Sequence, residues 1–246
     1  TAMVGVSAVL FMTAQVVPGL AAVAEACDRH GADLLVDAYH ALGTVVFDVH
    51  ELGLASAWVT GGGYKYLQLG EGNAFLRIPP HRHDVRPAIT GWFAEFDLLT
   101  TARDDPHHVA YGSPASRFAS GTYDPASAYR GARVFGFFED QGLTPGLLHE
   151  SYQHQLGVLA EAFDALGLPP DVIDRDRSTP IEGLGGFLSL IAPHAGEVRA
   201  GLTERGVLTD SRGDRLRVGP TPYLSDDQLA AGMAVIGEVA AQRSRG

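Results

Sequence analysis

Two short apolar segments, residues 4–12 and 34–37, and the amphipathic stretch between them constrain the fold most. Both segments are nearly continuous in apolar residues, which is typical of strands buried on both faces of a sheet. The stretch between them begins after Pro18, carries apolar residues at helical spacing and ends at Gly31, so it predicts a helix. Strand, helix and strand in this order form a β-α-β unit. We therefore expect a parallel sheet whose ligands bind at the carboxyl ends of its strands.

The residue composition and the apolar periodicity of the chain change near residue 80. Residues 80–125 are rich in His, Pro, Asp and Gly with little periodicity, and predict a long functional loop region. Apolar spacing predicts further strands over residues 58–60, 74–78, 186–192 and 207–218, and helices over residues 125–140, 144–166, 195–205 and 226–241. The elements after the long helix predict a second, smaller unit.

The charge balance excludes several classes of partner. The chain has 18 basic and 29 acidic side chains and a formal net charge of −11, so neither nucleic acid nor an anionic membrane surface is an expected partner. Apolar residues make up 46% and charged residues 19%, which predicts a chain that buries a core. A single Cys excludes a disulfide framework and fits a reducing compartment. No apolar run reaches the roughly 18 residues of a membrane span, so we expect a soluble cytoplasmic protein.

The window around Lys65 is the most informative for chemistry. Lys65 lies among glycines, between Tyr64 and Tyr66, directly after a predicted buried strand. A ligand can approach the backbone there, and a partly desolvated amine can act as a Schiff-base nucleophile. A phosphate-binding Walker loop would need Ser or Thr after the Lys, and the dinucleotide pattern would need a third glycine. A glycine-rich hairpin with a solvated Lys remains an alternative.

A second feature, Asp37 to His40, lies at the carboxyl end of the second predicted strand. A carboxylate in that place can hold the protonated ring nitrogen of pyridoxal 5'-phosphate, so Asp37 and Lys65 together outline a cofactor slot. Taken alone, Asp37 could equally be a cap or turn residue, and His40 a satisfied imidazole.

Several motifs together resemble a known family. They are Val6-Ser7 through Thr13, Asp37-Ala-Tyr-His40-Ala-Leu-Gly43, Tyr64-Lys65-Tyr66-Leu67, Gly91-Trp92-Phe93, Arg117-Phe118-Ala-Ser-Gly121-Thr122 and Arg217-Val-Gly-Pro-Thr-Pro222. In this order, and over essentially the whole chain, they resemble the fold type I pyridoxal-phosphate enzymes of the class V aminotransferase superfamily, most of all the kynureninase family. The resemblance implies that residues 1–140 form the later part of the α/β large domain and residues 141–246 a small C-terminal α+β domain.

The resemblance also implies roles for individual residues. Lys65 and Tyr64 would be catalytic, with Lys65 forming the Schiff base to the cofactor. The residues that would bind the cofactor are Asp37 at the pyridine nitrogen, His40, Tyr64 and Ser7 lining it, and Trp92 and Thr122 at the phosphate of a neighbouring subunit. The expected assembly is therefore a homodimer with shared active sites. Arg217 would bind the carboxylate of a small amino-acid substrate.

Arg217 also has a physical argument of its own. A planar guanidinium fits a carboxylate with two parallel hydrogen bonds, and the apolar neighbours Leu216 and Val218 predict a strand that holds it. Without the resemblance, Arg212 and Arg215 are equal candidates.

The chain departs from the family pattern in three places. Ala94-Glu95-Phe96 follows Gly-Trp-Phe where the family has Gly-His, and Glu71 stands between two glycines where the family has Pro. Both departures concern the substrate more than the cofactor. The chain also starts directly in an apolar run, so we expect the front of the large domain to be missing and these residues alone to bind the cofactor poorly.

Two other groups are weak candidates. The histidines at 81, 83, 107 and 108 lie in the irregular region without a supporting ligand pattern, so we expect no metal site. Cys27 precedes Lys65 and lies on an apolar helical face, so packing is preferred over the nucleophile of a cysteine desulfurase. The expected reaction is kynureninase-like hydrolysis of a β–γ carbon bond that releases alanine. The alternatives are a class V aminotransferase or lyase acting on another amino acid, and a non-catalytic scaffold homologue.

Overall fold

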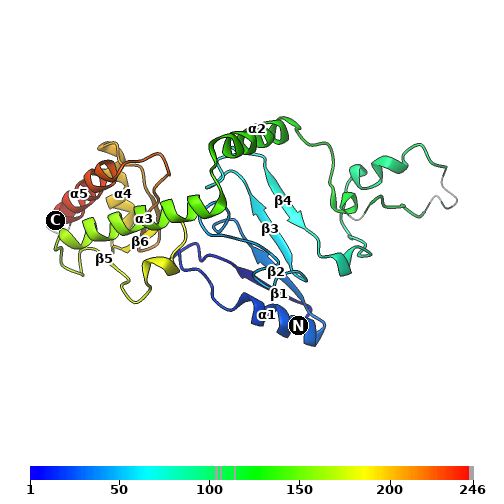
Figure 1. Ribbon diagram of the computed structural model, residues 1–246, viewed down its shortest axis with the longest axis horizontal. Helices are drawn as coiled ribbons and strands as arrows, with labels where there is room; N and C mark the ends of the chain where they lie inside the picture. The colour runs from blue at the N-terminus through cyan, green and yellow to red at the C-terminus, as the bar shows by residue number, and fades with distance from the viewer. Residues whose placement is uncertain (103–104, 106, 114, 244–246) are drawn as a thin grey trace.

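The computed structural model describes residues 1–102, 105, 107–113 and 115–243. Its first sheet has the order β1-β2-β3-β4, formed by β1 (Met3–Ser7), β2 (Asp33–Asp37), β3 (Trp58–Gly62) and β4 (Ala74–Arg77). The first three strands are parallel and β4 is antiparallel to β3. The expected mainly parallel sheet is confirmed (Figure 1).

The first strand is shorter than the sequence predicts. It ends at Ser7, whereas the apolar run continues to residue 12. The backbone turns back after Ala8, with Leu10 N–H donating to Gln15 O at 2.9 Å and Ala14 N–H donating to Leu10 O at 2.8 Å. Of the apolar residues beyond Ser7, Ala8 and Val9 are buried in this turn, whereas Leu10 and Phe11 are exposed, and none of them continues the strand.

Helix α1 (Leu20–His30) covers the first sheet as predicted. Its buried residues Leu20, Ala24 and Cys27 recur at helical spacing and pack in the same core as the strands. Gly31 ends the helix in the left-handed conformation, at φ 64°, which glycine adopts without a steric penalty. The packing role expected for Cys27 is confirmed.

The segment between β4 and the next long helix is irregular, as the sequence predicts. In its described residues it forms only three short 3₁₀ helices, η1 (Pro80–Arg82), η2 (Trp92–Leu98) and η3 (Ser116–Phe118). Figure 1 shows this segment, in teal and green, extending from the sheet to the far right of the molecule.

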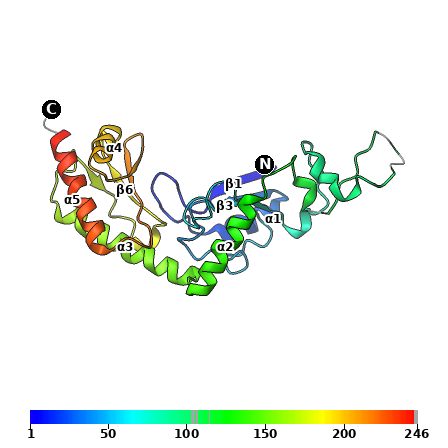
Figure 2. The ribbon, with the colours of Figure 1, turned by 90° about the horizontal axis from the view of Figure 1, so that it is seen from above.

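Helices α2 (Ala126–Gln141) and α3 (Pro145–Ala165) connect the two halves of the chain. Gly142 ends α2 at φ 67°, and the Thr144 hydroxyl then caps α3 by accepting the Leu147 N–H at 3.2 Å. Figure 2 shows α3 running from the region of the first sheet toward α4 and α5.

The second sheet is antiparallel, with the order β5-β6-β8-β7. Its elements are β5 (Asp174–Arg175), η4 (Ile181–Gly183), β6 (Leu188–Ile191), α4 (Ala195–Glu204), β7 (Asp210–Arg212), β8 (Arg215–Val218) and α5 (Asp226–Arg243). The predicted strand over residues 207–218 is a hairpin, because Gly213 at φ 57° turns the chain. Leu190, Leu216 and Met233 are fully buried in a core shared by this sheet and its helices.

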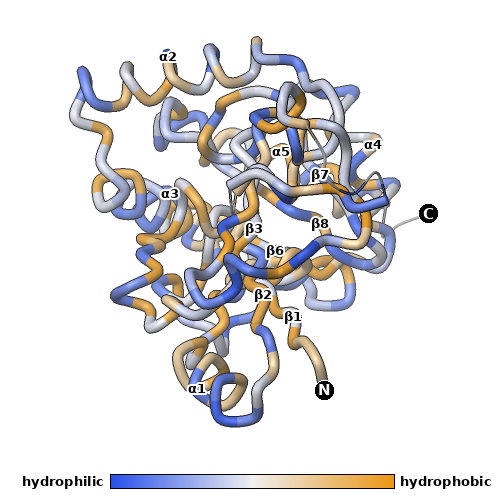
Figure 3. The backbone as a smooth tube through the Cα atoms, turned by 90° about the vertical axis from the view of Figure 1, so that its right-hand side faces the viewer, coloured by the Kyte–Doolittle hydropathy of each residue, from blue (hydrophilic) through white to orange (hydrophobic). Residues whose placement is uncertain are grey.

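Each sheet has its own hydrophobic core, and one loop of the first half reaches the second. Ala14 belongs to the second core, and its carbonyl accepts the Gly185 N–H at 2.7 Å. Figure 3 shows apolar tube segments along the labelled strands β1, β2, β3 and β6. The division near residue 140 remains a prediction. Among the described residues, no helix combines the length and apolarity needed to cross a membrane.

Candidate active site

The carboxyl ends of the three parallel strands bring together the first predicted site residues. Ser7 lies opposite Asp37 in the register of β1 and β2, and Asp37 lies opposite Thr60 in that of β2 and β3. The Asp37 carboxylate accepts the backbone N–H of Tyr39 at 2.8 Å. This bond makes Asp37 a turn residue, and it also fixes the orientation of the carboxylate at the edge of the sheet.

Lys65 follows β3 on a tight turn. Leu69 N–H donates to Gly63 O at 2.8 Å, and Gln68 N–H donates to Lys65 O at 3.1 Å. A methyl group at Gly62 would overlap the Tyr39 ring, and one at Gly63 would overlap the Leu69 side chain. The glycines before Lys65 are therefore required by close packing, which sets the position of the amine.

The surroundings of Lys65 make its amine easier to deprotonate. Burial lowers the pKa of Lys65 below its usual 10.5, and the Arg217 charge lowers it further. The charges of Asp37 and Asp210 raise the same pKa, and Asp37 has the larger effect of the two. Lys65 is thus a partly buried amine between charges of both signs, which favours a nucleophile or base over a freely solvated lysine.

Arg217 reaches this group from the second sheet. Its Nη2 lies 3.4 Å from His40 Nε2, and its Nη1 donates to Asp210 Oδ2 at 3.1 Å. The guanidinium also lies over the Phe187 ring, 4.5 Å from the ring centroid. Its side chain is 14% exposed. In the described part of the chain, Arg217 Nε is buried without a hydrogen-bond partner.

The three arginines of the hairpin differ in their surroundings. Arg212 has an exposed side chain and pairs with Asp210 at 2.8 Å, while Arg215 lies 3.6 Å from Asp214. Arg217 is the arginine that contacts His40 of the first sheet. The geometry therefore favours Arg217 as the cation beside the cofactor slot that the sequence predicts.

His40 is neutral in this environment. Burial, the Lys65 charge and the Arg217 charge lower the pKa of His40 from 6.5 to about 4, although Asp37 opposes the shift. A neutral imidazole has one donor and one acceptor nitrogen. Because Nε2 accepts from the arginine, the proton is assigned to Nδ1. The imidazole ring lies edge-on to Tyr66 and Phe187, with ring centroids 6.3 and 6.2 Å away.

Two hollows meet at these residues. The first, of about 440 Å³, is lined by Tyr64, Lys65, Tyr66, Gln68, Gly70, Tyr152, Gly219, Pro220, Thr221 and Tyr223. The second, of about 280 Å³, is lined by Tyr66, Phe187, Leu208, Thr209, Asp210, Arg217 and Gly219. They share Tyr66 and Gly219, so Lys65 and Arg217 open onto neighbouring spaces.

The other predicted site residues are more scattered. Tyr64 is exposed, and its ring centroid lies 5.7 Å from that of Tyr39. Lys65 Nζ lies 5.2 Å from the centroid of the Tyr64 ring. Trp92 packs in η2 against Phe93, with ring centroids 4.5 Å apart, and Thr122 is exposed in the same projecting segment. No contact found among the described residues links Trp92 or Thr122 to Lys65 of the same chain.

Three residues of the site were missed by the sequence reasoning. They are Tyr66, Tyr152 and Asp210. Burial raises the pKa of Tyr66 to about 12, and the Tyr66 ring packs against that of Tyr152 in α3, with centroids 5.6 Å apart. Reading residues 207–218 as a hairpin around Gly213, rather than as strand material, would have paired Asp210 with Arg217.

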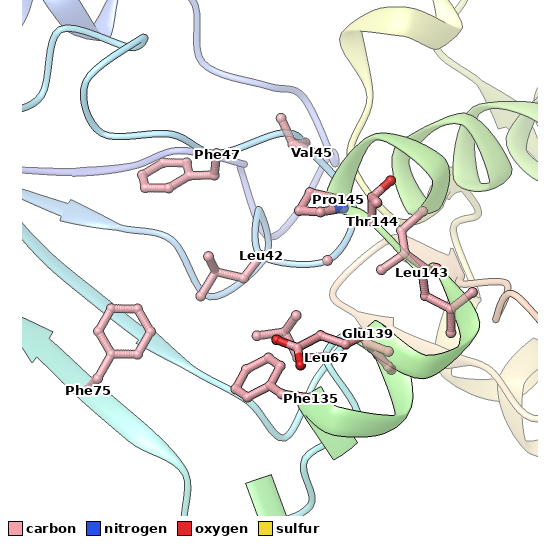
Figure 4. Close-up of a pocket in the computed structure, with 14 residues that line it drawn as sticks. Leu42, Val45, Phe47, Leu67, Phe75, Phe135, Glu139, Leu143, Thr144 and Pro145 are labelled. Atoms are coloured by element: carbon pink, nitrogen blue, oxygen red, sulfur yellow. The ribbon is translucent and has the colours of Figure 1, made fainter. Parts of the chain in front are cut away.

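A separate apolar cavity of about 580 Å³ lies between the turn after β2 and helices α2 and α3 (Figure 4). Leu42, Phe47, Leu67 and Phe135 line it, and Glu139 is its charged residue. Its described lining residues include no Lys, Arg, His or Cys and none of the residues that line the two hollows near Lys65 and Arg217, so it is a separate space.

The described residues contain no group of three or more His, Cys, Asp or Glu side chains arranged to hold a metal ion. The histidines at 81, 83, 107 and 108 are therefore not gathered into such a group in that part of the chain.

Comparison with curated proteins identifies relatives of two kinds. The chain is 31% identical over 129 residues to the uncharacterized aminotransferase YcbU of Bacillus subtilis (strain 168), covering 52% of this chain and 32% of the relative. It is 25% identical over 215 residues to kynureninase of Homo sapiens, covering 82% of this chain and 44% of the relative. The chain therefore spans less than half the length of these relatives. No family model matches it.

Solved structures share the fold over nearly the whole chain. A cysteine desulfurase from Thermococcus onnurineus NA1 aligns with a TM-score of 0.77 and 18% identity, covering 98% of this chain and 60% of that one. The ureidoglycine-glyoxylate aminotransferase of Bacillus subtilis aligns with a TM-score of 0.67 and 21% identity, covering 99% and 61%. These likenesses show the fold, and the two curated relatives add similarity in sequence. The chain therefore has the fold of these solved enzymes and is similar in sequence to an aminotransferase and to a kynureninase.

Proposed function

We propose that this chain forms a pyridoxal-phosphate enzyme acting on an amino acid, with Lys65 as the residue that holds the cofactor. The observation that supports this most is the convergence of the Lys65 amine, the Asp37 carboxylate and the Arg217 guanidinium from three different strands or turns. Arg217 belongs to the second sheet, so the site depends on the contact between the two halves of the chain.

The residues present fit the cofactor. The partly buried amine of Lys65 suits an aldehyde, and the Asp37 carboxylate at the strand edge suits a protonated ring nitrogen. Glycines at 62 and 63 allow the close contacts with Tyr39 and Leu69 that form the turn carrying Lys65. When bound, pyridoxal phosphate supplies an electron sink for negative charge at the α-carbon of an amino acid.

The protein side chains would then orient the substrate and move one proton. Arg217 would hold the substrate carboxylate with two charge-assisted hydrogen bonds, because its fork matches carboxylate geometry. Lys65 Nζ would take the proton from the α-carbon, which its lowered pKa favours. Tyr66 and Phe187 would exclude water from one side, since both rings are largely buried beside His40.

For the reaction itself we propose kynureninase-like cleavage. Water would add to a γ-carbonyl of the substrate and the β–γ bond would break, releasing alanine and an acid. Similarity to human kynureninase over 82% of this chain supports it. An aminotransferase or lyase reaction is the second candidate, supported by the 31% identity to YcbU and by the departures at Ala94 and Glu95. Measuring alanine release against amino-group transfer to an oxo acid separates the two.

We also propose a cytoplasmic homodimer in which the projecting segment of one subunit, with Trp92 and Thr122, completes the phosphate site of the other. The position of this segment beyond the sheet supports it (Figure 1). Mixing a Lys65→Ala variant with a Trp92→Ala variant tests it, because mixed dimers would regain part of the activity. No regain in verified mixed dimers would refute shared sites.

The first test of the proposed function is chemical. The full-length protein, purified and supplemented with the cofactor, is reduced with borohydride and digested, and the peptides are analysed by mass spectrometry. A pyridoxyl adduct on Lys65 is the expected result. If the folded protein carries no adduct on Lys65, the non-catalytic scaffold becomes the better account.

A further inference from the structure

Asp210 joins two arginines at the mouth of the site. Its Oδ1 accepts from Arg212 Nη1 at 2.8 Å, and its Oδ2 accepts from Arg217 Nη1 at 3.1 Å. Asp210 and Arg217 are register partners on β7 and β8, so their side chains lie on the same face of the hairpin. We refer to Arg212, Asp210 and Arg217 as the hairpin triad.

The hairpin triad holds Arg217 in one place. Asp210 fixes Nη1, His40 lies at Nη2, and the Phe187 ring covers the guanidinium at 4.5 Å. Arg217 is nearly buried, whereas the Asp210 side chain is 42% exposed. Both residues line the same hollow, so a ligand bound to Arg217 lies close to the Asp210 carboxylate.

The charges of the hairpin triad sum to a single positive charge. All three act on Lys65, because Arg217 and Arg212 lower its pKa and Asp210 raises it. Asp210 thereby offsets one of the two arginines. One remaining positive charge matches one carboxylate, whereas a second carboxylate on the ligand would meet the Asp210 charge.

We propose that Asp210 is a positioning and specificity-determining residue, which holds Arg217 for a single carboxylate and disfavours amino acids that carry a second one. This inference rests on the proposed function, since it takes Arg217 as the binder of the substrate carboxylate. The substrate class is an amino acid whose side chain carries no carboxylate.

The test compares two nearly isosteric amino acids, L-asparagine and L-aspartate, on the full chain loaded with cofactor. Calorimetry gives both dissociation constants for wild type, Asp210→Asn and Asp210→Glu. Wild type is expected to prefer L-asparagine by about tenfold, the effect of one partly screened charge at short range. Asp210→Asn is expected to abolish this preference, and Asp210→Glu to restore it. Because the readout is a ratio within each variant, a general loss of affinity does not mimic the effect.

Asp214→Asn is the matched control. Asp214 lies in the same hairpin, has an exposed side chain and lines neither of the two hollows. It should leave the ratio unchanged. If Lys65 carries the cofactor but Asp210→Asn keeps the wild-type ratio, or if neither amino acid binds, the role of Asp210 is wrong. If Lys65 carries no cofactor, the proposed function fails and this inference fails with it.

Discussion

Replacing Arg217 with alanine tests the most specific part of the site. The guanidinium has Asp210 at 3.1 Å, His40 at 3.4 Å and Phe187 below it, so it is held for a ligand without further ordering. In the Arg217→Ala variant, a substrate carboxylate would lose two charge-assisted hydrogen bonds, each contributing about 1.5–3 kcal/mol. Hydrogen bonds to water would restore part of this loss. A net loss of about 2.7 kcal/mol corresponds to a roughly hundredfold weaker affinity.

The assay is the dissociation constant of L-alanine, the expected product, for the cofactor-loaded protein. Arg217→Lys should weaken binding by only about tenfold, because it keeps the charge but loses the fork. Arg215→Ala is the control, since Arg215 is on the same strand and lies beside Asp214 instead. An Arg217→Ala variant that folds and binds L-alanine within twofold of wild type would show that Arg217 is not the carboxylate binder.

Three further predictions concern stability. His40 has a pKa of about 4 in the folded protein, below its usual 6.5, so the unfolded chain binds a proton at higher pH than the folded one. The free energy of unfolding should therefore fall by about 2 kcal/mol between pH 6.5 and pH 4. Urea titrations should show a smaller decrease for His40→Gln. Gly63→Ala, which forces a methyl group into Leu69, should cost about 1–3 kcal/mol and reduce adduct formation on Lys65; Gly5→Ala, where a methyl group meets nothing within 4 Å, should do neither. Thr144→Ala removes the cap of α3 and should lower the thermal midpoint through a loss of about 1 kcal/mol, and an unchanged midpoint would contradict the capping role.

Local patterns in the sequence were sufficient for most of the elements. The β-α-β unit, the end of α1 at Gly31, the irregular segment and the start of α3 near Thr144 all follow from residues close in the chain. The first strand was predicted too long, because apolarity reports burial and not the backbone conformation that produces it. The turn after Ala8 buries Val9 without extending the sheet.

The sequence by itself determined which candidate groups and motifs the chain carries: a Lys among glycines, an Asp at a strand end, and motifs that resemble known enzymes, two of which are similar to this chain in sequence. Only the tertiary structure decided which side chains meet. His40 and Arg217 are 177 positions apart, and their contact selects one arginine of three. Burial, followed by the Lys65 and Arg217 charges, lowers the pKa of His40 in this environment. The spacing of apolar residues along the chain indicates which face of a helix or strand is buried. It does not indicate which distant element that face packs against, because packing in the folded protein decides it.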